Sequence, residues 1–240
     1  MMNLMRLHKN YLFNKINIII IGIVILISIF LSFVLVKPFE TNIDKWNERL
    51  ISMQSYEQSY LLFVKILMVL LSSYLFGIYF SKQGDDYSLV LTCKVSKNKY
   101  LISKILTISL TIFFILFVII LFHLFIGTVF NRWYILNLNI ITHYFEIYLI
   151  SMTYGILSLI SIRLLKSLYA VIIPFSLYIL SEVLVDYNMS SKLVKFIEMF
   201  FPTTHLTNGN IVLLYGIIHL VILNIFYFII SYFVYIKYKE

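Results

Sequence analysis

Three ionisable side chains fall inside stretches of the chain that are otherwise apolar. Lys65, Glu146 and Glu182 each lie a few residues from the end of a long apolar segment. Charged side chains are rare at membrane depth, and those that occur there usually pair with one another and serve a function. We predict that Lys65 pairs with Glu146 or Glu182 to form an outer gate or a polar exit. The alternative is that all three extend to the lipid headgroups, because each lies only about 5 to 10 Å from the end of its helix.

A second chemical pattern lies between residues 84 and 104, where two acids precede a short apolar run and several lysines follow it. Aspartates can cap a helix and complement its positive end, whereas lysines suit its negative end. The pattern predicts a short helix along the membrane surface, with an apolar face that a partner can contact. The residues of this predicted contact site are Asp85, Asp86, Leu89, Val90, Leu91, Lys94, Val95, Ser96 and Lys97.

Motifs for ATP binding, proteolysis and metal binding are absent from the sequence. None of the seven glycines forms a Gly-x-x-x-x-Gly-Lys run followed by Ser or Thr, so no phosphate-binding loop is expected. There is no His-Glu-x-x-His and no Gly-x-Ser-x-Gly. Cys93 is the sole cysteine, which excludes a disulfide framework and a cysteine-based zinc pattern. We therefore predict no catalytic residue, no metal site and no cofactor in this chain.

Four histidines fall near the same ends of the apolar segments as the three charged residues. They are His123, His143, His205 and His219. Two histidines that face each other at one depth can ligate haem. Packing and hydrogen bonding within the helix bundle is the ordinary alternative, and it is the one we expect.

Six apolar segments must position these residues. A helix needs about 20 apolar residues to cross a hydrocarbon core of about 30 Å, and lipid cannot satisfy a bare backbone, so such segments must be helical. The chain is 61% hydrophobic and only 12% charged, and its loops are too short for a separate soluble domain. We predict an all-α polytopic membrane protein with one domain over residues 1–240. The segments are approximately 16–36, 60–80, 105–130, 144–162, 168–185 and 211–236.

Basic residues are concentrated on alternate loops. Because short basic loops stay in the cytoplasm, this bias predicts that both termini are cytoplasmic, and it accounts for the net charge of +8 without nucleic acid. Abundant isoleucine, asparagine and lysine with a single alanine indicate an AT-rich genome and predict a bacterial cell membrane. The more basic side carries Arg6, Lys9, Lys15, Lys82, Lys94, Lys97, Lys99, Lys104, Arg163, Lys166, Lys237 and Lys239; the other carries Lys37, Lys45, Arg49, Arg132, Lys192 and Lys195.

Three short amphipathic helices are predicted outside the spans. Residues 1–15 form an interfacial helix on the cytoplasmic leaflet, for which an unstructured basic tail is the alternative. Residues 43–53 and 190–202 each form an external helix, and Pro202 ends the second.

Packing between the spans is expected to use large side chains and hydroxyl groups more than grooves lined by small residues, because no span contains Gly-x-x-x-Gly. The hydroxyls in question are those of Ser72, Ser73, Ser158 and Ser161.

With these features together, the chain resembles the permease subunits of ABC-2 type ATP-binding-cassette exporters. Members of that family have six spans, cytoplasmic termini, an amphipathic entry helix, a coupling helix between spans two and three, and an external helix between spans five and six. In the loop, Asp85 or Asp86 matches the family's acid, Leu89 to Leu91 its apolar run, Val95 and Ser96 its Val-Ser pair, Lys97 its arginine, and Ser103 with Lys104 the pair that opens span three. Lys94 stands where the family usually has proline.

The resemblance implies a permease that depends on a separate ATPase subunit. Two ATPase copies would bind ATP and magnesium, and their motion would pass through the loop from Asp85 to Lys97 into the spans. A second permease, identical or a sister chain, would complete the pathway within the lipid.

The small size and the few charges in the spans are similar to permeases that export amphipathic peptides, including lantibiotic immunity permeases and the phenol-soluble-modulin exporter. An amphipathic or hydrophobic peptide is therefore the expected substrate. The alternative is a membrane scaffold or a peptide-sensing immunity protein that binds a partner without transport.

Overall fold

The computed structural model of the chain describes residues 5, 8–9, 12–35, 46–81, 96–130, 138–165, 171–186, 199–202 and 210–237. Within these residues the regular structure is helical, which confirms the all-α prediction for this part of the chain. The long helices are α2 (Lys15–Leu35), α3 (Trp46–Ser81), α5 (Lys97–Phe130), α6 (Leu138–Leu165), α7 (Ile172–Asp186) and α9 (Asn210–Lys237).

Five of these helices, α2, α3, α5, α6 and α9, are long and apolar enough to cross a membrane. The chain is therefore a multi-pass membrane protein. Two of the five exceed the thickness of a bilayer core: α3 has 36 residues and α5 has 34, or about 54 and 51 Å at 1.5 Å per residue. The predicted external helix at 43–53 is not a separate element where it is described, because Trp46 begins α3, which continues without a break to Ser81.

The fifth predicted span is shorter than the sequence indicated. The apolar run at 168–185 corresponds to α7, which has 15 residues, or about 22 Å, less than a hydrocarbon core of about 30 Å. Pro174 lies in its first turn, where the missing backbone N–H has no intrahelical partner in any case. By length, α7 does not join the five spanning helices.

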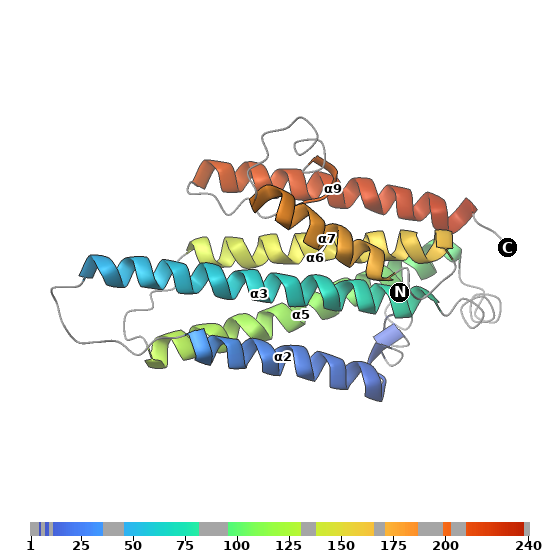
Figure 1. The fold of residues 1–240 in the computed structure, drawn as a ribbon. Helices are drawn as coiled ribbons and strands as arrows, with labels where there is room; N and C mark the ends of the chain where they lie inside the picture. The colour runs from blue at the N-terminus through green and yellow to red at the C-terminus, as the bar shows by residue number, and fades with distance from the viewer. Residues whose placement is uncertain are drawn as a thin grey trace.

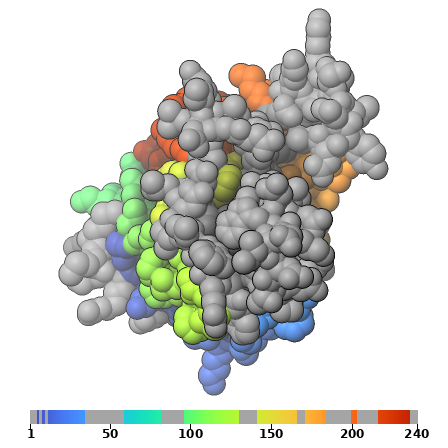
Figure 2. All heavy atoms as spheres, turned by 90° about the vertical axis from the view of Figure 1, so that its left-hand side faces the viewer, coloured from blue at the N-terminus to red at the C-terminus, as the bar shows by residue number. Residues whose placement is uncertain are grey.

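Helices α3 and α6 form the centre of the bundle and run parallel to each other (Figure 1). Helices α2 and α5 pack on one side of this pair, and α7 and α9 on the other. The direction of the chain alternates from each long helix to the next, so that α2 begins and α9 ends at the same end of the bundle (Figure 1). Figure 2 shows the bundle from the end at which α6 begins, and there α7 and α9 again lie on the side away from α2.

The α3–α6 contact, which we call the seam, combines hydroxyl hydrogen bonds with two glycines. The Ser72 hydroxyl on α3 donates to the Ser151 carbonyl oxygen on α6 at 2.5 Å, and the Ser158 hydroxyl on α6 donates to the Ser73 carbonyl oxygen on α3 at 2.8 Å. The prediction that hydroxyls join the spans is confirmed for Ser72 and Ser158, whereas Ser73 contributes its backbone carbonyl.

Small residues matter more in the seam than the sequence indicated. A Cβ atom added to Gly155 on α6 would lie 2.5 Å from Cδ2 of Phe76, and one added to Gly77 on α3 would overlap the Val171 side chain and lie 3.1 Å from Cδ1 of Ile162. Each helix contributes one glycine, so the close approach of the backbones needs no Gly-x-x-x-Gly within either sequence.

Candidate functional site

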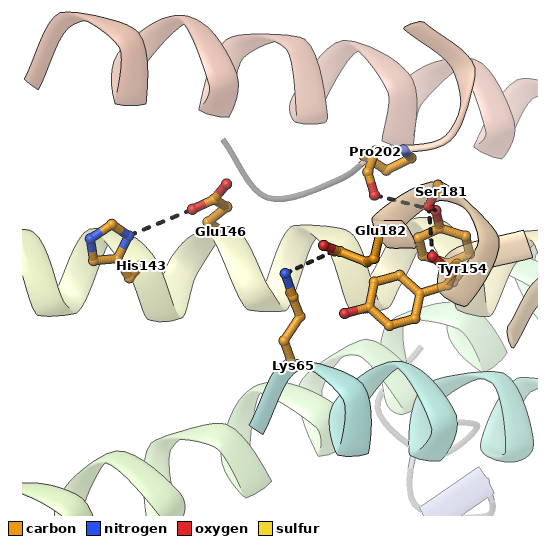
Figure 3. Close-up of polar contacts among 8 residues, drawn as sticks. Lys65, His143, Glu146, Tyr154, Ser181, Glu182 and Pro202 are labelled. Carbon is orange, nitrogen blue, oxygen red and sulfur yellow. Dashed lines mark hydrogen bonds and ion pairs between the residues drawn. The ribbon is translucent and has the colours of Figure 1, made fainter. Parts of the chain in front are cut away.

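The most unusual side chains of the bundle form a buried ion pair between α3 and α7. Lys65 Nζ lies 2.8 Å from Oε1 of Glu182, as Figure 3 shows. The side chain of Lys65 is fully buried and that of Glu182 is 15% exposed. The predicted pairing of Lys65 with one of the two glutamates is thus confirmed for Glu182.

The burial of Lys65 also decides against the headgroup alternative for this residue. A lysine that extends to the headgroups would reach the surface of the bundle, whereas Lys65 is 0% exposed. A charge in such a place is tolerated only when its partner and its surroundings are polar. Lys65 and Glu182 therefore belong to the interior of the bundle and form the centre of a candidate site.

Aromatic and hydroxyl groups surround the ion pair on the side of α6 and α7. Lys65 Nζ lies 5.9 Å from the ring centre of Tyr178, and that ring packs edge-on against Tyr154 at 5.2 Å. The Tyr154 hydroxyl lies 3.1 Å from Oγ of Ser181, the residue before Glu182, and donates to the Pro202 carbonyl oxygen at 3.2 Å. We call this set the central polar site: Lys65, Tyr154, Tyr178, Ser181, Glu182 and the Pro202 carbonyl. Figure 3 labels all of them except Tyr178.

Glu146, the other predicted partner of Lys65, precedes Tyr154 by about two turns on α6. Its side chain is 2% exposed, and its Oε2 atom lies 3.6 Å from Nδ1 of His143 on the same helix. In Figure 3 the Glu146 carboxylate is turned toward His143. The three predicted gate residues thus fall in one region of the bundle, with Lys65 paired to the glutamate of α7.

The histidines within the spans are used in packing and hydrogen bonding. His123 is buried, stacks on Tyr60 at 4.1 Å between ring centres and meets Tyr144 edge-on at 6.2 Å. His219 Nε2 on α9 lies 3.2 Å from the Met199 carbonyl oxygen. Within the ranges that the structure describes, no three or more His, Cys, Asp or Glu residues gather as a metal site would require.

Residues 199–202 lie deeper than the predicted external helix would place them. The Pro202 carbonyl accepts from Tyr154, which stands 16 residues after the start of α6 and 11 before its end. The Phe200 carbonyl accepts at 2.7 Å from Tyr227, which stands 17 residues after the start of α9 and 10 before its end. Along the helix axes, the segment is therefore level with the middle of α6 and of α9. Met199 and Phe200 are helical, as predicted, whereas Phe201 and Pro202 are not. Carbonyls without a helical partner are tolerated at such depth when protein groups satisfy them. Residues 190–198 of the predicted helix lie outside the described part of the chain.

A second buried polar group lies at the end of the bundle where α2 begins. His8 is 1% exposed, with Nδ1 2.7 Å from the Tyr79 hydroxyl and Nε2 3.0 Å from the Ser103 hydroxyl. Ser103 in turn donates to the Tyr100 carbonyl oxygen at 2.8 Å. The Tyr79 hydroxyl also donates to the His8 carbonyl oxygen at 3.1 Å. We call His8, Tyr79, Tyr100, Ser103 and Lys104 the His8 cluster.

Lys104 completes this cluster as a buried cation among aromatic rings. It is 1% exposed, and its Nζ lies 4.5 Å from the ring centre of Phe80, 4.6 Å from that of Tyr79 and 5.6 Å from that of Tyr100. A desolvated lysine over aromatic faces gains about 2 kcal/mol or more. Because Phe80 is next to the last residue of α3 and Lys104 lies in the second turn of α5, the cluster joins the two helix ends that flank residues 82–95.

Most of the predicted coupling residues fall in that intervening segment. Asp85, Asp86, Leu89, Val90, Leu91, Lys94 and Val95 lie outside the described residues. Ser96 and Lys97 are described. The Ser96 side chain caps α5, with its Oγ accepting from the Lys99 backbone N–H at 3.4 Å and its carbonyl accepting from the Tyr100 N–H at 3.1 Å. Lys97, exposed, is the first residue of α5.

The predicted interfacial helix is helical at the described residues Met5, His8, Lys9 and Leu12. His8 and Leu12 are buried and Lys9 is exposed, so the segment docks into the bundle through one face. The role of His8 was not predicted, because a single histidine in a basic stretch forms no motif. Its spacing of four residues from Leu12 is the one signal that places both on the same helix face.

Comparisons with known proteins add no family to this picture. No protein-family model, no curated protein and no solved structure matches the chain.

Proposed function

We propose that this chain is the membrane permease subunit of an ABC exporter, driven by a separate ATPase, and that it moves amphipathic or hydrophobic peptides out of a bacterial cell. The observation that carries the proposal is the His8 cluster. The loop that resembles a coupling helix is bounded by the ends of α3 and α5, and buried contacts of Lys104 and His8 fasten those two ends to each other and to the segment before α2.

Such a fastening suits the transmission of force. A push on a loop moves a helix only if the base of the loop is held firmly to that helix, and interlocked interiors transmit displacement because they are dense. From the cluster, α3 runs along the seam with α6 to Lys65, which lies on α3 in the central polar site. Motion at the end of the bundle with the His8 cluster can thus be transmitted through packed side chains along α3 to the Lys65–Glu182 ion pair.

The interior also fits the proposed substrate class. Away from the ion pair and the His8 cluster, the buried side chains of the described bundle are mainly apolar, with serine and threonine hydroxyls among them. A peptide with apolar and charged faces matches such a lining better than a small ion or a sugar does.

The test is ATP hydrolysis by the complex purified from native membranes through a tag on this chain. We expect an ATPase to co-purify and an amphipathic peptide to stimulate it. Asp86→Lys and Lys97→Glu should abolish the stimulation, whereas Lys15→Glu, a charge reversal at an exposed residue of the same bundle end, should preserve it. A chain that purifies without an ATPase would instead favour the scaffold function.

A further inference from the structure

Residues 199–202 have the chemical character of a peptide ligand. The segment reads Met-Phe-Phe-Pro, and the carbonyls of Met199, Phe200 and Pro202 contact donors on α6 and α9, namely His219 at 3.2 Å, Tyr227 at 2.7 Å and Tyr154 at 3.2 Å. The Phe201 ring packs against the small apolar cluster that includes Tyr154 and Tyr178.

These hydrogen bonds are made to the main chain of residues 199–202. Each donor is a side chain of the surrounding helices, and each of these acceptors is a backbone carbonyl, which every peptide carries. Recognition of this kind takes its affinity from main-chain hydrogen bonds and its preference from the side chains that pack alongside. The surface beneath residues 199–202 therefore suits any peptide stretch with apolar side chains.

The neighbouring Lys65–Glu182 ion pair provides charged groups that suit an amphipathic peptide. Ser181, which lies 3.1 Å from the Tyr154 hydroxyl, directly precedes Glu182, and Glu182 binds Lys65 at 2.8 Å. A positive and a negative group thus stand beside the carbonyl-binding donors at the middle of the bundle. A peptide with charged residues next to an apolar stretch can exchange partners with this pair, so that neither buried charge is left uncompensated.

We propose that the surface of α6, α7 and α9 covered by residues 199–202 is the substrate peptide site, and that Met199–Pro202 is its resident occupant, which the substrate displaces. The proposal rests on the proposed function and adds where and how the peptide is bound. Because the occupant is tethered, its effective concentration is in the millimolar range, and only a ligand that matches its contacts can replace it.

A reversible covalent lock tests the exchange. In a Cys93→Ser background, the pair Ser181→Cys with Pro202→Cys places thiols on the two residues that flank the Tyr154 hydroxyl. The full chain in lipid nanodiscs is titrated with a fluorescein-labelled amphipathic Leu/Lys peptide of about 20 residues, and empty nanodiscs report partition into lipid. Oxidation should weaken binding about tenfold or more, since a locked occupant cannot leave, and a reductant should restore it. Each single-cysteine variant should not respond.

A second pair of variants works without a disulfide. Phe201→Ser removes the ring that seats the occupant, whereas Phe233→Ser, the control, alters a ring on α9 that is 63% exposed and lies outside residues 199–202. Weakening the occupant should tighten peptide binding about threefold or more in the first variant and leave it unchanged in the second.

The outcomes separate this inference from the proposed function. Equal peptide affinity of the oxidised and reduced protein, with Phe201→Ser also unchanged, would place the peptide elsewhere and leave the exporter proposal standing. Binding no stronger than to empty nanodiscs in every form would overturn both the peptide class and this site.

Discussion

The seam between α3 and α6 and the opposite side of α6, where α7 and residues 199–202 lie, are held together by different means. The seam has close backbones, reciprocal serine hydrogen bonds and a large apolar cluster shared with α2 and α5. The α7 side has a small apolar cluster, one buried ion pair and hydroxyl-to-carbonyl bonds. Interlocked apolar packing resists rearrangement, whereas polar partners can be exchanged for equivalent ones. We therefore expect the seam to be the fixed part of the bundle, and α7 with residues 199–202 to be the movable part.

The largest expected effect is on the ion pair. Lys65→Met leaves the Glu182 carboxylate in the interior without its lysine, and removing one partner of a buried pair typically destabilises a protein by about 3 to 5 kcal/mol. The free energy of unfolding, measured by SDS titration in mixed micelles, should fall accordingly and peptide export should stop.

The double variant Lys65→Met with Glu182→Met is the matched control, and it should regain most of the lost stability because no charge remains buried. If Lys65→Met left both stability and export unchanged, the pair would be neither a structural element nor a gate.

The seam is tested by glycine substitutions with opposite expected signs. Gly155→Ala places a Cβ 2.5 Å from the Phe76 ring, and overpacking of this kind costs about 1 to 3 kcal/mol. Gly22 on α2 has nothing within 4 Å of an added Cβ, so Gly22→Ala should be neutral or stabilising by up to about 1 kcal/mol through helix propensity. Thermal unfolding of the detergent-solubilised variants measures both. Equal shifts for the two would show that the seam is not tightly packed.

The α7 side of the bundle is tested through the hydroxyl of Tyr154. Tyr154→Phe removes the donor to the Pro202 carbonyl and the contact with Ser181, which should destabilise the chain by about 1 to 2 kcal/mol. The effect should be local. Hydrogen exchange measured by mass spectrometry should accelerate in α7 and at residues 199–202 while α3 stays protected. Uniform acceleration through α3 would contradict the division into a fixed and a movable part.

The smallest effect is expected from a single seam hydroxyl. Ser158→Ala deletes the bond to the Ser73 carbonyl, and interhelical hydrogen bonds in membranes average about 0.6 kcal/mol. A loss of that size in SDS titration, well below the loss caused by Gly155→Ala, would show that close packing dominates the seam. A larger loss from the serine than from the glycine would reverse that ranking.

The helices and the pairing of Lys65 could be predicted from the sequence, because they depend on composition and on how few charges the apolar segments contain. Apolar length is enough to predict the helices, and the scarcity of charge in the interior is enough to predict that Lys65 finds a glutamate. Ser72 and Ser158 were expected at helix contacts because few other polar groups are available there. The position of the Pro202 carbonyl was not predicted, because helical spacing in 190–202 gives a face but no depth.

Other features depend on which helices meet, and no local pattern reveals that. Gly77 and Gly155 are far apart in the sequence and become a pair only when α3 lies beside α6. His8 acquires partners 71 and 95 residues away. The continuity of α3 beyond its apolar part was missed because the polar residues after Trp46 resemble a separate amphipathic helix.

The proposed contact between the loop and an ATPase is tested most directly through Cys93, the sole cysteine, which lies in the sequence between α3 and α5. A maleimide carrying a photoactivatable benzophenone is attached to Cys93 in inverted membrane vesicles and irradiated with the native complex present. We expect a cross-link to a nucleotide-binding ATPase subunit, and no labelling by a membrane-impermeant maleimide added to intact cells. Labelling of Cys93 from outside, or a chain that forms no cross-link to an ATPase, would contradict this expectation.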